Sequence, residues 1–234
     1  MKFGITNLSW KQEEHFFISN KLINYDYLET VFSRRNSGVY YSTQSIFYDS
    51  GINSFTDNNI LDYLNYVIDE CFKCGIKIIV FGSPSLRKND KTILLNIFDS
   101  IDNKLKDNKI YLCVEPNSSY YGGEYYFSLD EIVTDIKKYS NIKTMIDTHN
   151  LILEKEIPIN QYKKYSEYIK HIHISEKDLK PIEDWNMCSE FVDFLRKEHY
   201  GYGITYELKH NENQNLIFES KKFLSLNNEN SYLY

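Results

Sequence analysis

Four residues that can bind a metal ion come at the ends of four short apolar segments. They are Glu115, Asp147, His173 and Glu207. The segments are rich in β-branched and aromatic side chains, so each is typical of a buried strand. A carboxylate inside such a strand carries a large desolvation cost unless a cation or a proton compensates it. We therefore predict that the three carboxylates and the imidazole share one cation.

The residue types narrow the choice of ion and indicate a reaction. Oxygen ligands with a single imidazole suit Mn²⁺, Mg²⁺ or Co²⁺ best, and Zn²⁺ is the alternative ion. Such an ion positions a hydroxy-carbonyl compound and makes its α-proton acidic. Glu115 and Glu207 are predicted to lie on the fifth and the eighth of the predicted strands, residues 109–115 and 203–208. They therefore lie on different sides of the substrate, so one can remove the proton and the other can return it. The predicted reaction is isomerisation or epimerisation through an enediolate.

Three basic residues directly follow two of the predicted strands. Arg34 follows strand 2, whereas Arg87 and Lys88 follow strand 4 in a polar loop. This position predicts that they surround the opening of the active site and hold an anionic group of the substrate, for which arginine has a bidentate fork. For Arg34, a solvated loop charge is an equally good interpretation.

The segments that position these residues alternate between strands and helices. Eight strands in this order imply a parallel sheet closed into a (β/α)8 TIM barrel, in which functional side chains gather at the C-terminal ends of the strands. Pro116 supports this interpretation, because it cannot donate to a sheet ladder and so ends the strand that carries Glu115. The predicted strands cover residues 2–6, 27–31, 39–44, 76–81, 109–115, 142–147, 168–174 and 203–208.

Helical periodicity and capping residues mark the helices between the strands. Apolar residues recur at helical spacing from Ile60 to Cys71, and Ser128 and Glu131 form a capping box. Residues 36–38 are too few for a crossover helix, so the helix between strands 2 and 3 is reduced or missing. The predicted helices cover residues 11–20, 58–74, 92–105, 128–139, 161–168, 186–199 and 214–226.

Composition and charge limit the class of protein. With 234 residues, 42% of them hydrophobic, the chain can bury one substantial core, so we predict a single domain over residues 1–234. The net charge is −6 and no dense lysine and arginine tract occurs, which argues against a nucleic-acid partner. No apolar run has the length of a signal peptide or a bilayer span, so a cytoplasmic protein without a membrane partner is expected. For the oligomeric state, both a monomer and a homodimer are compatible with the sequence.

The order of these motifs resembles a known family, the xylose-isomerase-like TIM barrels, which include sugar phosphate isomerases/epimerases and are related to ketose 3-epimerases and endonuclease IV. The resemblance covers residues 2 to about 210. It implies a carbohydrate substrate, the same four metal ligands, and Glu115 and Glu207 as the acid/base pair. The matching blocks are Val114-Glu115-Pro116-Asn117, Ile146-Asp147-Thr148-His149-Asn150, His171-Ile172-His173-Ile174-Ser175-Glu176 and Tyr206-Glu207-Leu208.

The resemblance also indicates where substrate would bind. Gln44 lies in residues 42–48, a segment that is similar to uncharacterised family members. His149 follows Asp147 by two residues, whereas ketose 3-epimerases have a substrate-binding histidine three residues after the aspartate. We therefore expect the substrate-binding residues to be Gln44, His149, Arg34, Arg87 and Lys88.

Three other functions compete with this one. Phosphodiester hydrolysis like that of endonuclease IV needs further histidines on strands 3 and 4, which this sequence lacks. A dehydratase or lyase acting on a sugar acid would use the same enolate chemistry and needs only a leaving group on the substrate. An inactive sugar-binding barrel is opposed by the complete set of four predicted ligands.

Overall fold

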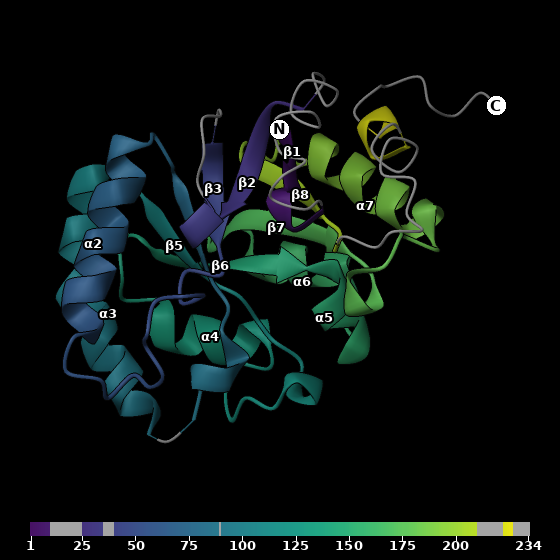
Figure 1. The fold of residues 1–234 in the computed structure, drawn as a ribbon. Helices are drawn as coiled ribbons and strands as arrows, with labels where there is room; N and C mark the ends of the chain where they lie inside the picture. Colours follow the sequence, from purple (N-terminus) through teal and green to yellow (C-terminus); the bar gives the residue numbers. More distant parts are fainter. Residues whose placement is uncertain (10–24, 35–39, 89, 210–221, 227–234) are drawn as a thin grey trace.

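The computed structural model of the chain is a closed barrel of eight parallel strands with helices around it (Figure 1). The structure describes residues 1–9, 25–34, 40–88, 90–209 and 222–226. The strands follow one another around the barrel in sequence order, and β8 pairs with β1 to close it. The (β/α)8 TIM barrel predicted from the sequence is therefore confirmed.

All eight predicted strands are present, and their ends differ from the predicted ones by no more than two residues. Glu115 lies just beyond β5, although its backbone N–H still donates to the carbonyl of Phe81 in β4 at 3.1 Å. The strands are β1 (Lys2–Thr6), β2 (Tyr27–Val31), β3 (Tyr40–Gln44), β4 (Ile78–Phe81), β5 (Tyr111–Val114), β6 (Ile142–Asp147), β7 (Ile169–Ser175) and β8 (Gly203–Glu207).

The described α-helices are α2 (Ile60–Lys73), α3 (Lys91–Asn108), α4 (Leu129–Ile136), α5 (Thr148–Leu153), α6 (Pro158–Tyr165) and α7 (Trp185–Lys197). Short 3-10 turns are η1 (Asn7–Ser9), η3 (Phe32–Arg34), η4 (Pro84–Leu86), η5 (Ser119–Tyr121) and η6 (Lys177–Leu179). The helix α5 was not predicted. It begins directly after Asp147, the last residue of β6. The helix predicted over residues 11–20 lies outside the described residues, as does most of the one over 214–226.

The connection between β2 and β3 is short, as predicted. After β2 the described residues form only the turn η3, and residues 35–39 are not described. β3 nevertheless pairs in parallel with β2, with Thr43 opposite Thr30. Within the described part of this connection no α-helix covers the strands.

Alternation along the strands separates the barrel interior from the layer beneath the helices. One small buried cluster joins inward-facing side chains of three neighbouring strands: Ile78, Val80, Cys113 and Met145. Glu115 and Asp147 lie two residues beyond Cys113 and Met145, so they face the same side. The apolar cluster therefore forms a layer inside the barrel below the carboxylates.

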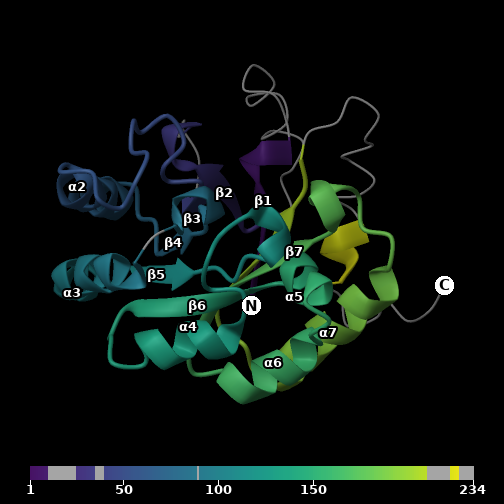
Figure 2. The same ribbon diagram turned by 90° about the horizontal axis from the view of Figure 1, so that it is seen from below.

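The larger hydrophobic core lies between the strands and the helices. Val67 and Ile68 of α2 and Ile101 of α3 are almost fully buried in it, and burial of each such side chain contributes about 1.5–3 kcal/mol. The helices α2 and α3 pack side by side, while α7 lies on the opposite side of the barrel (Figures 1 and 2). None of the helices in the described ranges combines the length and apolar character needed to cross a membrane.

Candidate metal centre

The four predicted ligands meet at the C-terminal end of the barrel. One ligand atom each from Glu115, Asp147, His173 and Glu207 lies within 4.8 Å of the others. The strand register brings them together, because His173 pairs with Asp147 on one side while Ser175 of the same strand pairs with Glu207 on the other. The side chain of His173 is fully buried, and the three carboxylates are at most 13% exposed.

His173 lies at the centre of this group. Its Nδ1 is 3.1 Å from Oε2 of Glu207, 3.7 Å from Oε1 of Glu115 and 4.0 Å from Oδ2 of Asp147. Among the described residues neither Nδ1 nor Nε2 of His173 has a hydrogen-bond partner of good geometry. Two ligands of an ion with bonds of about 2.1 Å lie about 3.0 Å apart at right angles and about 4.2 Å apart on opposite sides. The observed separations therefore fit one hard cation between the four side chains.

Neighbouring polar groups hold two of the carboxylates in place. Oδ1 of Asp147 accepts hydrogen bonds from the backbone N–H of Asn150 at 2.9 Å and from the hydroxyl of Ser175 at 2.8 Å, which leaves Oδ2 for the cluster. Oε2 of Glu115 accepts a hydrogen bond from the side-chain amide of Asn117 at 3.1 Å. Each carboxylate therefore keeps one oxygen directed at the other ligands.

The buried carboxylates of the cluster need a compensating positive charge. Burial and the charge of Asp147 raise the pKa of Glu115 above its usual value, and burial and Glu207 do the same to the pKa of Asp147. Burial lowers the pKa of His173, but Glu29 and Glu207 together raise it well above its usual value. A divalent cation would replace the protons that these groups otherwise take up. The residues present thus fit a divalent metal ion.

Gly82, directly after β4, provides the space in which Glu115 lies. A Cβ atom at this position would overlap with Oε2 of Glu115. Because glycine has no Cβ, the carboxylate can pass over the end of β4 and reach the cluster.

Replacing Gly82 with alanine is expected to push the Glu115 carboxylate out of the cluster. We expect the affinity for Mn²⁺ to fall by more than about 10–100-fold, the loss that follows when an outer partner of a metal ligand is removed, because here the predicted ligand itself is displaced. Gly201→Ala is the matched control, because no atom lies within 4 Å of a Cβ there. Titration calorimetry measures both variants, and equal affinities would contradict the close approach at Gly82.

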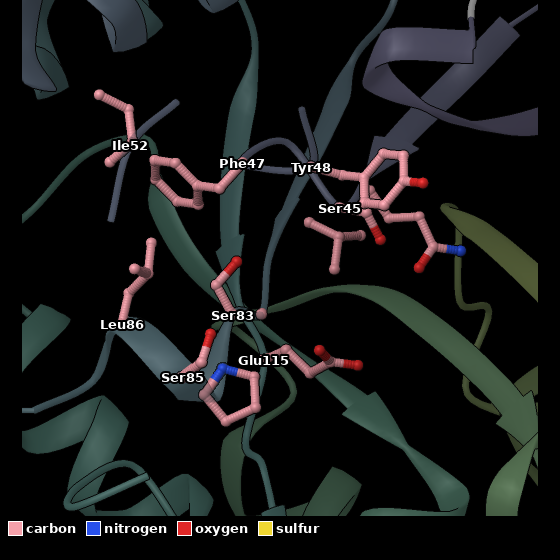
Figure 3. A pocket seen from close by; sticks show the side chains of 12 residues that line it. Ser45, Phe47, Tyr48, Ile52, Ser83, Ser85, Leu86 and Glu115 are labelled. Atoms are coloured by element: carbon pink, nitrogen blue, oxygen red, sulfur yellow. The ribbon is translucent and has the colours of Figure 1, made fainter. Parts of the chain in front are cut away.

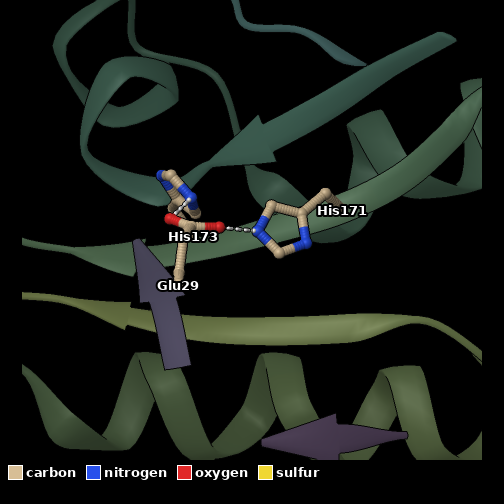
Figure 4. Close-up of side chains that lie close together, drawn as sticks. All are labelled: Glu29, His171 and His173. Carbon is tan, nitrogen blue, oxygen red and sulfur yellow. Dashed lines mark hydrogen bonds and ion pairs between the residues drawn. The ribbon is translucent and has the colours of Figure 1, made fainter. Parts of the chain in front are cut away.

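Glu29 is a residue of the site that sequence reasoning missed. It is fully buried in the middle of β2, and its carboxylate lies between two histidines of β7 (Figure 4). Oε2 is 2.6 Å from Nε2 of His171, and Oε1 is 2.8 Å from Nε2 of His173. The sequence did carry a signal, because Glu29 is a carboxylate inside a short strand of otherwise uncharged residues.

A pocket of about 400 Å³ opens beside Glu115 (Figure 3). Figure 3 shows Phe47, Ile52 and Leu86 gathered on one side and the carboxylate of Glu115 on the other. Gln44 also lines the pocket, as its predicted role requires, and its amide donates to Oε1 of Glu29 at 3.1 Å. The remaining lining residues are Ser45, Tyr48, Val80, Gly82, Ser83, Pro84 and Ser85.

His149 is buried in α5, two residues beyond Asp147, and lies outside the cluster of four ligands. Its Nε2 is 2.9 Å from the hydroxyl of Tyr121 in η5. The same loop is tied to α5 by Ser118, whose backbone N–H donates to the side chain of Asn150 at 3.0 Å. The structure thus places His149 between the predicted ligand Asp147 and the loop after β5, and the contact of His149 with substrate stays a prediction.

The structure places Arg87 against the end of β4, where it is buried. Its side chain is fully buried, donates a hydrogen bond to the carbonyl of Phe81 at 2.8 Å, and lies 5.7 Å from the centre of the Tyr126 ring. The turn η4 brings the chain back toward the end of β4, so Arg87 packs against the strand end. It is not among the residues that line the pocket. Arg87 is therefore buried rather than open to the pocket, and its contact with substrate stays a prediction.

The two other predicted cations are placed differently. Lys88 is exposed and does not line the pocket. Arg34 ends η3 directly after β2, but its side chain is not among those described. Their contact with substrate stays a prediction.

Comparison with known proteins finds similarity in structure. No family model and no curated protein matches the chain. The 3-keto-D-glucoside 4-epimerase from E. coli superposes with a TM-score of 0.75 and 12% identity, over 97% of this chain and 99% of that one. The D-psicose 3-epimerase from Clostridium cellulolyticum H10, solved with D-tagatose, has a TM-score of 0.73 and 16% identity, over 94% and 89%.

A third solved structure extends the comparison to phosphorylated sugars. The sugar phosphate isomerase/epimerase from Parabacteroides distasonis has a TM-score of 0.70 and 13% identity, over 96% of this chain and 92% of that one. Similarity at this identity establishes the fold, which all three proteins share with this chain over nearly its whole length. The chain therefore shares its TIM-barrel fold with these sugar epimerases and with the sugar phosphate isomerase/epimerase.

Proposed function

We propose that this chain is a divalent-metal-dependent isomerase or epimerase that acts on a sugar or a sugar phosphate. The observation that carries the proposal is the cluster of Glu115, Asp147, His173 and Glu207 at the C-terminal end of the barrel, where TIM barrels have their active sites. The similar structures support a carbohydrate substrate, since they include two sugar epimerases. Three carboxylates with one imidazole favour Mn²⁺, Mg²⁺ or Co²⁺ over Zn²⁺.

The four side chains would hold the ion, whose positive charge makes the hydrogen next to a substrate carbonyl acidic. Glu115 and Glu207 then carry the proton. They follow β5 and end β8, with β6 and β7 between them, so their carboxylates reach a central substrate from different directions. One glutamate removes the proton to form an enediolate, and the other returns a proton. Return to the opposite face inverts the carbon, whereas return to the neighbouring carbon moves the carbonyl.

The pocket beside Glu115 suits the part of the sugar that does not react. Its volume of about 400 Å³ lies within the range of small-ligand sites. Phe47 and Leu86 offer an apolar surface for the C–H groups of a sugar, while the hydroxyls of Ser45 and Ser83 and the side-chain carbonyl of Gln44 can bind its hydroxyl groups. This mixture is typical of sites for polar organic molecules.

Proton exchange with solvent tests the proposal. The Mn²⁺-loaded protein is incubated in D₂O with a panel of free ketoses and ketose phosphates. We expect at least one of them to gain deuterium at the carbon next to the carbonyl, as measured by NMR, and to be converted to its epimer or isomer. Protein prepared without chelator that takes up no divalent cation would refute the metal-dependent mechanism.

A further inference from the structure

A buried network lies behind the metal site. His171 and His173 share one face of β7, because they are two residues apart, and Glu29 of β2 lies between their rings (Figure 4). All three side chains are fully buried. Gln44 and Thr205 complete the surroundings of the carboxylate, with donors 3.1 Å from Oε1 and 3.4 Å from Oε2. Both oxygens of Glu29 are therefore held.

Each oxygen of the Glu29 carboxylate faces one imidazole, at 2.6 Å for His171 and 2.8 Å for His173. A buried polar group needs partners of this kind, because it has lost its contacts with water. The two imidazoles therefore fix the orientation of the carboxylate between them.

The same three residues resemble a second metal site, because their ligand atoms also lie within 4.8 Å of one another. The distances argue against this interpretation. Ligands with bonds of 2.0–2.1 Å to Zn²⁺ or Mg²⁺ lie about 2.8–3.4 Å apart. Oε2 of Glu29 is 2.6 Å from Nε2 of His171, which is below this range, and Oε1 is 2.8 Å from Nε2 of His173, which is at its lower limit. These are direct contacts between the groups, which leave no space for an ion.

We propose that Glu29 and His171 are positioning residues for His173. Oε1 of Glu29 lies 2.8 Å from Nε2 of His173. In the proposed arrangement this oxygen keeps the proton of His173 on Nε2, which leaves the Nδ1 lone pair directed at the three carboxylates. His171 holds the other oxygen of Glu29, so the carboxylate cannot turn away. The two histidines of β7 thus have different tasks, since His173 binds the ion and His171 fixes the residue behind it. This inference rests on the proposed metal-dependent function.

Replacing Glu29 with glutamine tests the arrangement. Glutamine has the same size but only one acceptor oxygen, so one of the two imidazoles would face an amide NH₂ group. We expect the Kd for Mn²⁺, measured by titration calorimetry, to rise by about 10–100-fold, as is typical when the residue behind a ligand is lost. Glu131→Gln is the matched control. Glu131 accepts the backbone N–H groups of Tyr126 and Phe127 at the start of α4, so the Kd should stay at the wild-type value.

The protonation of His173 gives a second readout that needs no variant. Zn²⁺ is diamagnetic and accepts both carboxylate and imidazole ligands, so ¹⁵N NMR can be recorded on the Zn²⁺-loaded wild-type protein. We expect a proton on Nε2 of His173 and none on Nδ1. A proton on Nδ1, or an unchanged Kd in a folded Glu29→Gln variant, overturns the positioning role while leaving the proposed function intact. Failure of the wild-type protein itself to bind a divalent cation overturns both.

Discussion

Asp147→Asn is expected to abolish metal binding at micromolar concentrations of Mn²⁺. The substitution removes one of three negative charges from the cluster, yet the asparagine side chain still has an oxygen that can accept the backbone N–H of Asn150 at the start of α5. The fold should therefore remain. Because Asp147 is itself a ligand in the proposed site, the loss of affinity should exceed the about 10–100-fold that follows from losing an outer partner.

Metal content and thermal unfolding measure this effect. A ligand at 100 times its Kd stabilises the folded state by about 2.7 kcal/mol, so Mn²⁺ should raise the melting temperature of the wild-type protein and leave that of the variant unchanged. Asp130→Asn is the control, because Asp130 is an exposed residue of α4 that pairs with Lys164. Stoichiometric Mn²⁺ in Asp147→Asn would show that the cluster does not bind the ion as assigned.

The barrel and the clustering of Glu115, Asp147, His173 and Glu207 could be predicted because both leave local patterns in the sequence. Each strand is a short apolar run, and each ligand lies at or near the end of such a run, as Asp147 does in β6. Parallel strands in sequence order bring their C-terminal ends together. Finding the ends of the strands therefore also located the ligands relative to one another.

Glu29 could not be assigned in the same way, because its partners lie far away in the sequence. It precedes His171 by 142 residues, and only closure of the barrel places β2 across from β7. Nothing around Glu29 indicates which side chains it meets. A carboxylate in the middle of a buried strand does show, however, that some partner must exist.

Arg87 shows why side-chain direction in a loop is harder to predict than strand position. The sequence places it after β4, where a cation could face the substrate. Its actual direction depends on η4 and on Glu124, whose backbone N–H donates to the Arg87 carbonyl at 2.8 Å. These contacts form only when the loop after β5 folds over the loop after β4. The same dependence on neighbouring loops applies to His149, which meets Tyr121.

Glu207→Gln is expected to have the second large effect, on turnover. General acid–base catalysis typically contributes about 10²–10⁴ to the rate, and a glutamine at this position can neither take nor return the proton. Turnover should therefore fall by at least about 100-fold. Glu167→Gln, an exposed residue before β7 and outside the cluster, is the control and should keep the wild-type rate.

Loss of metal must be separated from loss of proton transfer in this variant. Oε2 of Glu207 lies 3.1 Å from Nδ1 of His173, so the substitution should also weaken metal binding. Turnover is therefore measured at Mn²⁺ concentrations that saturate the variant, as established by its own titration. A wild-type rate at saturating Mn²⁺ would show that Glu207 only binds the ion and that another group carries the proton.

Solvent deuterium then identifies the path of the hydrogen in the wild-type protein. If Glu115 and Glu207 exchange the proton through an enediolate, the product formed in D₂O at low conversion should contain deuterium at the carbon next to the carbonyl. Carboxylates that reach the pocket or the surface can exchange a captured proton with water between turnovers, and Glu115 lines the pocket. Turnover without incorporated deuterium, under conditions in which exchange is shown to occur, would instead indicate a hydride shift between adjacent carbons. The glutamates would then only bind the metal, and Glu207→Gln at saturating Mn²⁺ should lose little activity.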